Sequence, residues 1–501
     1  MGKYLIAHDL GTSGNKASLF STEGQLIKSY TVPYTVHFFH NNHAEQDPMD
    51  WWKAVCEATK SIVSGINPSD VLAISFSGQM SSCIIVDDTC TPLRPALIWA
   101  DQRAEEQALQ LEEKIGFDRI YELTGHRISA SYSLEKLMWI RDHEPELYAK
   151  TYRMLLAKDF IICKLTGKFV TDYSDASGTN ALDLKNRCWS QEILDAADID
   201  RNKLPELHNS TDIIANLTAE SASLLHLSTN TVVVCGGGDG PCSAVGAGCI
   251  DSEQLFLSYG TSAWIGGTTK KVFLDENKVL FCFAHVIPNR YMPCGTMQAA
   301  GSSYSYIKDA LCQSEMVTAR QQNISEYELL NALVEKSPVG SKGLLFLPYM
   351  LGERSPRWNP NTSGSFIGIK MEHRKEDYIR AVLEGVAMNL SLILNAYGNK
   401  LHTKRMIFIG GGAKGDSLAR ILSDVLNVSL VRPNHVENAT SIAAALIAGI
   451  GVGVFQDFSK INNFLDIKDC IHPIDTNVAI YKTQKLLFDQ AYHCLEPLYK
   501  I

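Results

Sequence analysis

The same short loop stands twice in this chain, once in each half. Residues 7–20 read AHDLGTSGNKASLF and residues 257–267 read LSYGTSAWIGG, so in both an apolar run passes through Gly-Thr-Ser into a second strand-like run. Thr12 and Thr261 lie 249 positions apart in a chain of 501 residues. A duplicated domain with one such hairpin in each half is the simplest explanation.

The two loops have the chemistry of phosphate-binding hairpins. Glycine lets the backbone approach a ligand closely, while Thr and Ser hydroxyls and nearby N–H groups donate hydrogen bonds to phosphate oxygens. We therefore expect Gly11, Thr12 and Ser13 to bind a polyphosphate from one side of a cleft. Gly260 and Thr261 would bind it from the other side, and this arrangement points to ATP.

Composition limits the class of partner. With 45% hydrophobic residues and this length the chain is expected to form at least two domains. A net charge of −9 gives no general attraction to nucleic acid or to anionic membranes. We expect a small-molecule ligand and no nucleic acid, and a homodimer stays open.

Location is predicted from the apolar segments and the cysteines. The chain begins with a strand-like run and has no secretory pattern, and the longest apolar stretch, residues 441–455, is too short to span a bilayer. The 13 cysteines include no CxxC pair and no zinc-like spacing to histidine. We therefore expect reduced thiols, a cytoplasmic protein and no membrane partner.

The apolar patterns predict an α/β protein of two domains, residues 1–247 and 248–501. The first half opens with three strand-like runs, and Asp47 and Pro48 then begin a helix as N-cap and first helical residue. Residues 71–80 read as a buried strand with a polar tip. Strand ends of this kind carry function in α/β sheets.

Helical patterns dominate residues 104–215, which we interpret as an insertion or lid on the core. Residues 231–248 close the first half with a strand, a Gly-rich turn and a helix of small residues. The second half repeats the scheme and also ends in a small-residue helix, at 441–453.

Two aspartates are candidates for the chemistry. Asp9 directly precedes the first Gly-Thr-Ser loop, where a carboxylate beside phosphate needs a bridging cation, so we expect an Mg²⁺ site there. Asp239 stands among the glycines of residues 236–240, before a helix. Phosphoryl transfer to an alcohol needs a group that accepts the hydroxyl proton, and an aspartate fits this role. The structural alternatives are an Asx-type turn at Asp9 and a helix N-cap at Asp239.

Candidate ligand contacts follow other strands. Polyols are usually bound by planar polar side chains with an apolar wall, which the segments around Gln79, Met80, Trp99 and Asp101 offer. For Ser77 and Ser81, in the segment around Gln79, the structural alternative is that they cap the end of a strand. In the second half, residues 410–414 follow a strand and suit close approach to an adenine or ribose; they include Gly411, Gly412, Ala413 and Lys414.

In combination, these segments resemble the FGGY family of carbohydrate kinases, and within it most closely the xylulose kinases. Residues 131–143 fit the first family signature, and residues 364–384 fit the second except that Tyr378 stands where an aliphatic residue or Phe is usual. EQDPMDWW, TDYSDASGT at 171–179 and FLPYMLGERSP at 346–356 are also similar to xylulose kinase segments.

The resemblance implies a duplicated ribonuclease-H-like fold of the actin-like ATPase type, with ATP in the interdomain cleft. It implies that Asp239 is the catalytic base and Asp9 the metal-associated carboxylate, with Thr12 and Thr261 binding phosphate. It also implies an adenosine side and a sugar side: Gly411, Gly412 and Lys414 for the first, and Gln79, Met80, Trp99 and Asp101 for the second.

Two positions depart from the xylulose kinase pattern. Ser81 stands where His is usual and Gly240 where Asn follows the catalytic Asp, so each change removes a polar group from the acceptor pocket. The expected activity is ATP-dependent phosphorylation of a ketopentose, with D-xylulose the leading substrate and the 5-phosphate its product. Another pentulose, a pentitol or another FGGY substrate are the alternatives within the family.

Two alternatives belong to other classes, an actin-like ATPase that works on protein partners and a non-catalytic sugar sensor. The sugar-side segments argue against the first. The second is disfavoured because the chain retains Asp9, Thr12, Asp239 and Thr261.

Overall fold

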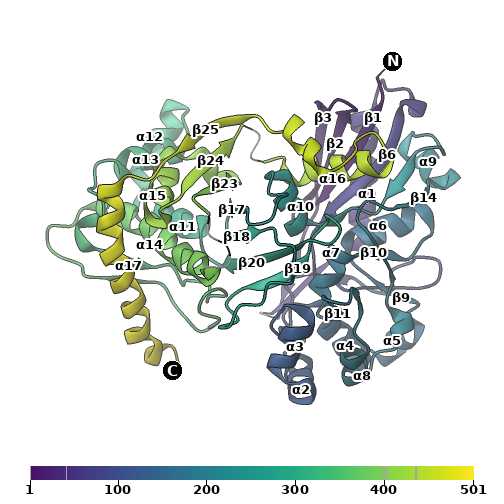
Figure 1. The fold of residues 1–501 in the computed structure, drawn as a ribbon, viewed down its shortest axis with the longest axis horizontal. Helices are drawn as coiled ribbons and strands as arrows, with labels where there is room; N and C mark the ends of the chain where they lie inside the picture. The colour runs from purple at the N-terminus through teal and green to yellow at the C-terminus, as the bar shows by residue number, and fades with distance from the viewer. Residues whose placement is uncertain (1, 41, 399–400, 402, 435–436, 501) are drawn as a thin grey trace.

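Two lobes, each with a mixed sheet covered by helices, make up the protein (Figure 1). The computed structural model describes residues 2–40, 42–398, 401, 403–434 and 437–500. The first sheet has the order β14-β15-β6-β1-β2-β3 and the second the order β19-β20-β18-β17-β23-β24-β25. The strands of the first sheet are β1 (Tyr4–Leu10), β2 (Gly14–Ser21), β3 (Leu26–Pro33), β6 (Val71–Gly78), β14 (Ile213–Asn216) and β15 (Val232–Val234). Those of the second are β17 (Leu255–Tyr259), β18 (Ala263–Gly267), β19 (Phe281–Ala284), β20 (Tyr291–Met297), β23 (Arg405–Ile409), β24 (Ser429–Pro433) and β25 (Ile467–Ile471).

Both sheets follow one plan. In the first, β1 pairs antiparallel with β2 and parallel with β6; in the second, β17 pairs antiparallel with β18 and parallel with β23. Each sheet adds an antiparallel strand beyond its hairpin, β3 or β20, and a second parallel strand on the other side, β15 or β24. The duplication predicted from the paired loops is therefore confirmed by the strand order, while the boundary at residue 247 stays a prediction.

The first lobe begins as the sequence predicts. Helix α1 (Pro48–Val63) has Pro at its first position, and Asp47 accepts a hydrogen bond from the Met49 N–H at 2.8 Å. This bond satisfies one of the free N–H groups at the start of the helix. Trp51 and Val55 lie buried on the face that packs against β2 and β3.

The helical insertion predicted at residues 104–215 joins the first lobe to the second. The Tyr121 hydroxyl donates to the Leu280 carbonyl at 2.7 Å, and the Cys282 N–H donates to the Gly125 carbonyl at 2.9 Å. The insertion therefore contacts β19 of the second sheet as well as its own lobe. Its helices are α2 (Glu105–Ile115), α3 (Phe117–Thr124), α4 (Ser133–His143), α5 (Pro145–Lys150), α6 (Ala157–Thr166), α7 (Tyr173–Ala176) and α8 (Gln191–Ala197).

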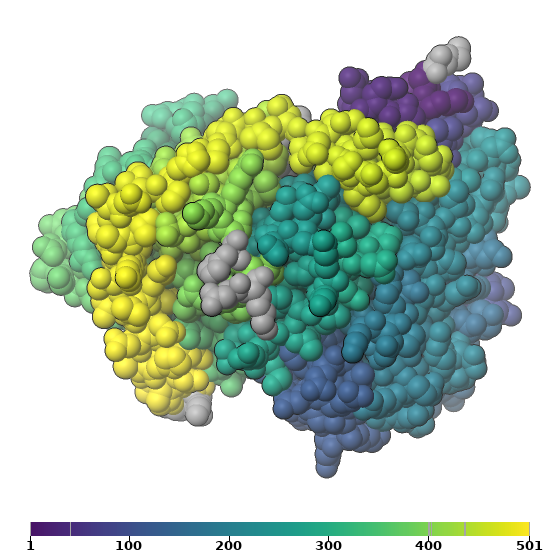
Figure 2. Space-filling view, viewed as in Figure 1, coloured from purple at the N-terminus to yellow at the C-terminus, as the bar shows by residue number. Residues whose placement is uncertain are grey.

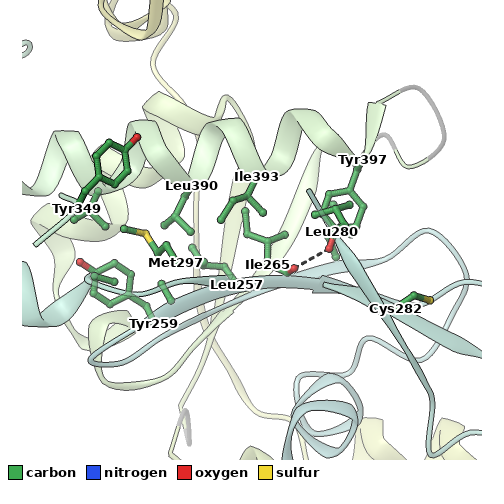
Figure 3. Close-up of a cluster of buried hydrophobic side chains, with 14 of the residues drawn as sticks. Leu257, Tyr259, Ile265, Leu280, Cys282, Met297, Tyr349, Leu390, Ile393 and Tyr397 are labelled. Carbon is green, nitrogen blue, oxygen red and sulfur yellow. Dashed lines mark hydrogen bonds between the residues drawn. The ribbon is translucent and has the colours of Figure 1, made fainter. Parts of the chain in front are cut away.

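Helix α14 (Lys375–Ala396) covers one face of the second sheet. Leu390 and Ile393 point from the helix toward Leu257 and Ile265 of the sheet, and the Tyr397 hydroxyl donates to the Ile265 carbonyl at 2.7 Å (Figure 3). This helix is long and apolar enough to cross a membrane, but 78% of its most apolar stretch of 18 residues is buried inside the protein. The other large helices of this half are α11 (Gly301–Leu311), α12 (Gln313–Gln322), α13 (Glu326–Val334), α15 (Asp416–Leu426) and α17 (Asp475–Leu495).

The two small-residue helices, α10 (Asp239–Gly246) and α16 (Ala439–Gly451), pack against each other. A Cβ on Gly246 would overlap the carbonyl of Ala439, so only glycine permits this approach. Helix α16 also packs on β1 and β6, and Figures 1 and 2 show this late segment, in yellow-green, against the purple N-terminal strands. The chain thus returns to the first sheet after it has completed most of the second.

Candidate active site

The two candidate aspartates lie at the same edge of the first sheet. Asp9 is near the end of β1, where it pairs with Ser77 of the parallel strand β6. Asp239 directly follows the short strand β16 (Gly237–Gly238), which pairs with β6 at Ser77 and Gly78. The carboxyl ends of these parallel strands meet here, which is where α/β sheets bind ligands.

The environment of Asp239 suits a proton acceptor. Its half-buried carboxyl has a pKa raised to about 7, chiefly by loss of solvation and further by the charge of Asp9. The Gly240 N–H donates to its Oδ1 at 2.7 Å. Gly238, and not Asp239, is the N-cap of α10, so the helix-cap alternative for Asp239 is wrong. A carboxyl with a pKa near neutrality gives and takes a proton readily at pH 7.

Asp9 is linked to helix α16. Its Oδ2 accepts a hydrogen bond from the Thr440 hydroxyl at 2.6 Å, which ties the first strand to a residue 431 positions later. Burial raises the pKa of Asp9, while the Thr440 bond and the charge of Lys16 lower it. Asp9 lies inside strand β1, and its carboxylate accepts a hydrogen bond from Thr440 of α16. It does not form the Asx-type turn considered as the alternative.

The Asp9 site fits Mg²⁺ in the manner of nucleotide-dependent enzymes. Mg²⁺ is usually held by one or two carboxylates together with phosphate oxygens and water. Asp9 is a partly exposed carboxylate next to a hairpin rich in hydroxyl groups, which matches that donor set. Over the described residues no group of three or more His, Cys, Asp or Glu side chains forms an enclosed metal site.

The first hairpin loop takes part in a hydrogen-bond network with the sugar-side segments. The Trp99 indole N–H donates to the Thr12 hydroxyl at 2.9 Å, and the Gln46 amide donates to the Thr12 carbonyl at 2.8 Å. Gln79 in turn donates to the Gln46 side chain at 2.9 Å. Sequence reasoning missed Gln46, although it belongs to the EQDPMDWW segment that carries the family resemblance.

The four predicted sugar-side residues do not share one environment. Met80 packs beside the Asp239 loop, since a Cβ on Gly238 would lie 2.6 Å from the Met80 sulfur. Trp99 is 40% exposed and available to a ligand. Asp101, however, is buried and is held by the Arg103 guanidinium at 2.8 Å and the Ala44 N–H at 2.7 Å. These two bonds reach Oδ2, and the Arg103 backbone N–H donates to Oδ1 at 3.1 Å, so both Asp101 oxygens have protein partners.

The second hairpin and the Gly-rich turn meet in one pocket of about 780 Å³. Five of the predicted residues line it: Gly260, Thr261, Gly411, Gly412 and Lys414. Ala413 is buried behind this surface and uses its carbonyl to accept from Arg432 at 3.0 Å. The pocket also has a polar and aromatic wall that sequence reasoning missed, formed by Tyr304, Tyr327 and Asn331. Gly11, Thr12 and Ser13 do not line it.

The Gly-rich turn has a packing role besides its place in the pocket. A Cβ on Gly412 would overlap the ring of Tyr259 on β17, whereas a Cβ on Gly411 would meet nothing within 4 Å. Lys414 forms an exposed ion pair with Glu437. Gly411 is thus the position where the backbone is open to a ligand.

The two positions that depart from the xylulose kinase pattern are both close to Met80. The Ser81 hydroxyl donates to the Gly178 carbonyl at 2.8 Å, and Ser81 has a left-handed backbone with φ of 60°. A Cβ on Gly240 would lie 3.4 Å from the Met292 methyl and 3.8 Å from the Met80 sulfur. These are ordinary contact distances, so a Cβ at position 240 would fit against both side chains without a clash.

Comparison with known proteins agrees with this geometry. Residues 4–246 match the N-terminal domain and residues 255–452 the C-terminal domain of the FGGY family of carbohydrate kinases. The chain is 33% identical to a xylulose kinase of Lactococcus lactis subsp. lactis (strain IL1403), over 98% of this chain and 96% of the relative.

Solved structures include kinases with two different substrates. A gluconate kinase from Lactobacillus acidophilus matches with a TM-score of 0.93 and 28% identity, over 100% of this chain and 99% of that one. A ligand-bound xylulose kinase from Lactobacillus acidophilus matches with a TM-score of 0.92 and 28% identity, over 99% of both chains. The two lobes are therefore the domains of an actin-like ATPase fold, and the protein is a sugar kinase that belongs to the FGGY family of carbohydrate kinases.

Proposed function

We propose that this kinase transfers the γ-phosphoryl group of ATP to the terminal hydroxyl of a ketopentose, foremost D-xylulose, and yields the 5-phosphate. The observation that carries the chemistry is Asp239, a half-buried carboxyl whose pKa is raised to about 7 beside Met80 and Asp9. The choice of sugar rests on similarity to the xylulose kinases.

In the proposed reaction Asp239 is the base. Gly240 donates to its Oδ1 at 2.7 Å, so Oδ2 is the oxygen that takes the proton of the sugar hydroxyl. The hydroxyl oxygen forms a bond to the γ-phosphorus as the bond from that phosphorus to the β,γ-bridging oxygen breaks, and ADP leaves. The proton stays on Asp239 until it passes to solvent.

The hairpins hold the phosphates in this proposal. An indole N–H is a donor only, so Thr12 accepts from Trp99 and turns its own hydroxyl proton toward another acceptor. A phosphate oxygen fits that acceptor role, and Thr261 supplies the corresponding hydroxyl from the second lobe. Mg²⁺ bound through Asp9 would neutralise charge that develops on the phosphate oxygens.

The pocket of the second lobe is proposed to bind the nucleoside. Its volume of about 780 Å³ lies in the range of small-molecule sites. Tyr304 and Tyr327 would contact the base, and Gly411 would allow close approach of the ribose. We also propose that the enzyme works in the cytoplasm, because all thirteen cysteines are free thiols.

A screen of acceptors tests the proposed substrate. ADP release is measured with D-xylulose, other pentuloses, pentitols, glycerol and gluconate, and we expect the highest kcat/KM with D-xylulose. Gluconate is the second candidate, because a gluconate kinase is as similar in structure as a xylulose kinase. A preference for gluconate overturns the choice of sugar. No release with any ketopentose overturns the proposed substrate and leaves only the sugar kinase class.

A further inference from the structure

A buried serine outside the proposed catalytic machinery holds the backbone next to Asp239. The N–H of Gly238 donates to the Ser174 hydroxyl oxygen at 3.0 Å. That hydroxyl donates to Oδ2 of Asp172 at 2.6 Å. Ser174 and Asp172 are fully buried. Because a carboxylate only accepts, the hydroxyl proton of Ser174 points to Asp172. A lone pair of the Ser174 hydroxyl oxygen therefore faces the Gly238 N–H.

Asp172 is itself fixed from three directions. Lys158 forms an ion pair with its Oδ1 at 3.0 Å, and the Ser210 hydroxyl donates to its Oδ2 at 2.7 Å. The Ser174 N–H donates to the same Oδ2 at 2.9 Å. A buried ion pair with additional hydrogen bonds has little freedom to rearrange, because every lost contact leaves a charge without solvation. Asp172 is therefore a fixed acceptor for Ser174.

The loop that Ser174 holds has no spare volume around it. A Cβ on Gly237 would lie 2.9 Å from the Ser174 hydroxyl, and a Cβ on Gly238 would lie 2.6 Å from the Met80 sulfur. Both glycines are buried. The hydrogen bond from Gly238 therefore sets the course of the backbone in a tightly packed passage, one residue before Asp239.

We infer that Ser174 is a positioning residue for the phosphoryl-transfer step, because its hydroxyl fixes the backbone from which the Asp239 side chain extends. The inference rests on the proposed role of Asp239 as the base. Displacing a catalytic group by about 1 Å costs roughly a hundredfold in rate. The loss should appear in kcat, since Ser174 lies in the first lobe, whereas the proposed nucleoside pocket is lined by residues of the second.

The structure supplies a matched control. Ser174 and Ser210 both donate to Oδ2 of Asp172, but only the Ser174 side chain also bonds the loop. Ser210 contacts the loop through its backbone carbonyl, which accepts from the Gly236 N–H at 2.9 Å and survives substitution by Ala. Ser174→Ala and Ser210→Ala thus remove the same kind of bond to Asp172 and differ in the bond to Gly238.

The test compares kcat, KM for ATP and melting temperature in the full-length variants, with the acceptor that gives the highest turnover. We expect Ser174→Ala to lower kcat by roughly 10- to 100-fold with KM for ATP within about twofold of wild type. Ser210→Ala should keep kcat within about threefold at a similar loss of melting temperature. Equal kcat for the two variants would overturn the inference.

A second substitution covers the case in which Ser174→Ala does not fold. Ser174→Cys fills a similar space with a weaker acceptor, so its kcat should fall between those of wild type and Ser174→Ala. A folded Ser174→Cys enzyme with wild-type kcat contradicts the inference. Asp239→Asn in the same assay separates the two proposals. If Asp239→Asn retains turnover, the assigned base is wrong. If Asp239→Asn is inactive while the Ser174 variants keep wild-type kcat, only the role of Ser174 fails.

Discussion

The indole of Trp99 donates its N–H to the hydroxyl of Thr12 at 2.9 Å, and so connects the proposed sugar side to the first phosphate hairpin. Trp99 is 40% exposed and comes from a segment 87 residues away from Thr12. One side chain can thus contact the acceptor and orient a hydroxyl for the phosphate. Binding of acceptor and nucleotide is therefore expected to be coupled through this pair.

Trp99→Phe should weaken this coupling while it keeps an aromatic wall. The variant loses one neutral hydrogen bond, which corresponds to about 0.5–1.5 kcal/mol and to roughly a 2- to 10-fold loss in kcat/KM for ATP. Steady-state kinetics at saturating acceptor give the value. Trp189→Phe is the control. Its indole N–H donates to the Pro205 carbonyl at 3.0 Å in the helical insertion, so the variant loses a similar bond and should leave this constant unchanged. If Trp99→Phe has the wild-type kcat/KM for ATP, the hydrogen bond from Trp99 to Thr12 does not contribute to the use of ATP.

The pH dependence of turnover should report Asp239. As a base the carboxyl must be ionised, and burial together with the charge of Asp9 holds its pKa at about 7. The value of kcat/KM for the acceptor should therefore rise with pH and level off above that pKa. Asp239→Asn should lose about 10²–10⁴ in kcat while nucleotide binding, followed by calorimetry, persists. A profile that is flat between pH 5 and 8 would contradict this assignment.

The same carboxyl should reduce the stability of the fold at high pH. Its pKa is raised from an ordinary value of 3.8 to about 7, so the unfolded chain ionises first as pH rises and the folded protein loses free energy of unfolding across that interval. Asp239→Asn removes this loss. We expect a gain on the order of 2 kcal/mol at pH 8, after allowance for partial exposure, and no gain at pH 4. Urea unfolding at the two pH values measures it, and an equal gain at both would reject the electrostatic cause.

Thr440 should influence the metal requirement through Asp9. Its hydroxyl donates to Asp9 at 2.6 Å and lowers the pKa of that carboxyl against the effect of burial. Thr440→Val leaves Asp9 harder to ionise, so the Mg²⁺ concentration for half-maximal activity should rise at least several-fold at pH 7 and less at pH 8. Thr440→Ser keeps the donor and should behave as wild type. If Val and Ser variants need the same Mg²⁺ concentration, the bond does not act on the metal site.

Acceptor selectivity should be broad and should respond to Gly240. Gly240 has no polar side chain beside Met292 and Met80, so sugar hydroxyls have fewer directional contacts there. We expect at least one other pentulose or pentitol to have kcat/KM within about tenfold of D-xylulose, which equals roughly 1.4 kcal/mol. Gly240→Asn should shift preference toward D-xylulose, and Gly240→Ala, which adds no polar group, should not. Exclusive use of D-xylulose by the wild type would refute this expectation.

Local signals in the sequence predicted much of the fold. The Gly-Thr-Ser loops read as strand, turn and strand because those residues specify their own backbone, and the duplicated hairpins are present. Asp47 and Pro48 predicted the start of α1 for the same reason, since capping depends on neighbours in the chain. The runs of small residues also predicted the two helices α10 and α16.

Contacts between residues that lie far apart in the chain could not be predicted from the sequence. Gln46 lies 34 residues from Thr12, and Thr440 lies 431 residues from Asp9, so no local pattern links either pair. Asp101 was predicted to contact the sugar because its type suits a polyol, and this stays a prediction. The structure adds that the Arg103 guanidinium donates to its carboxylate, which residue types alone do not indicate.

The return of α16 to the first sheet means that the two halves are no longer independent folding units. Leu5, Ala7 and Val234 of the first lobe are buried in one cluster with Ile442 and Leu446 of that helix. A fragment that ends at residue 247 would therefore expose an apolar strip to water and is expected to aggregate when produced alone. Co-expression with the remaining residues would restore the cover. The stability of the first lobe is therefore expected to depend on a helix that the ribosome makes near the end of the chain.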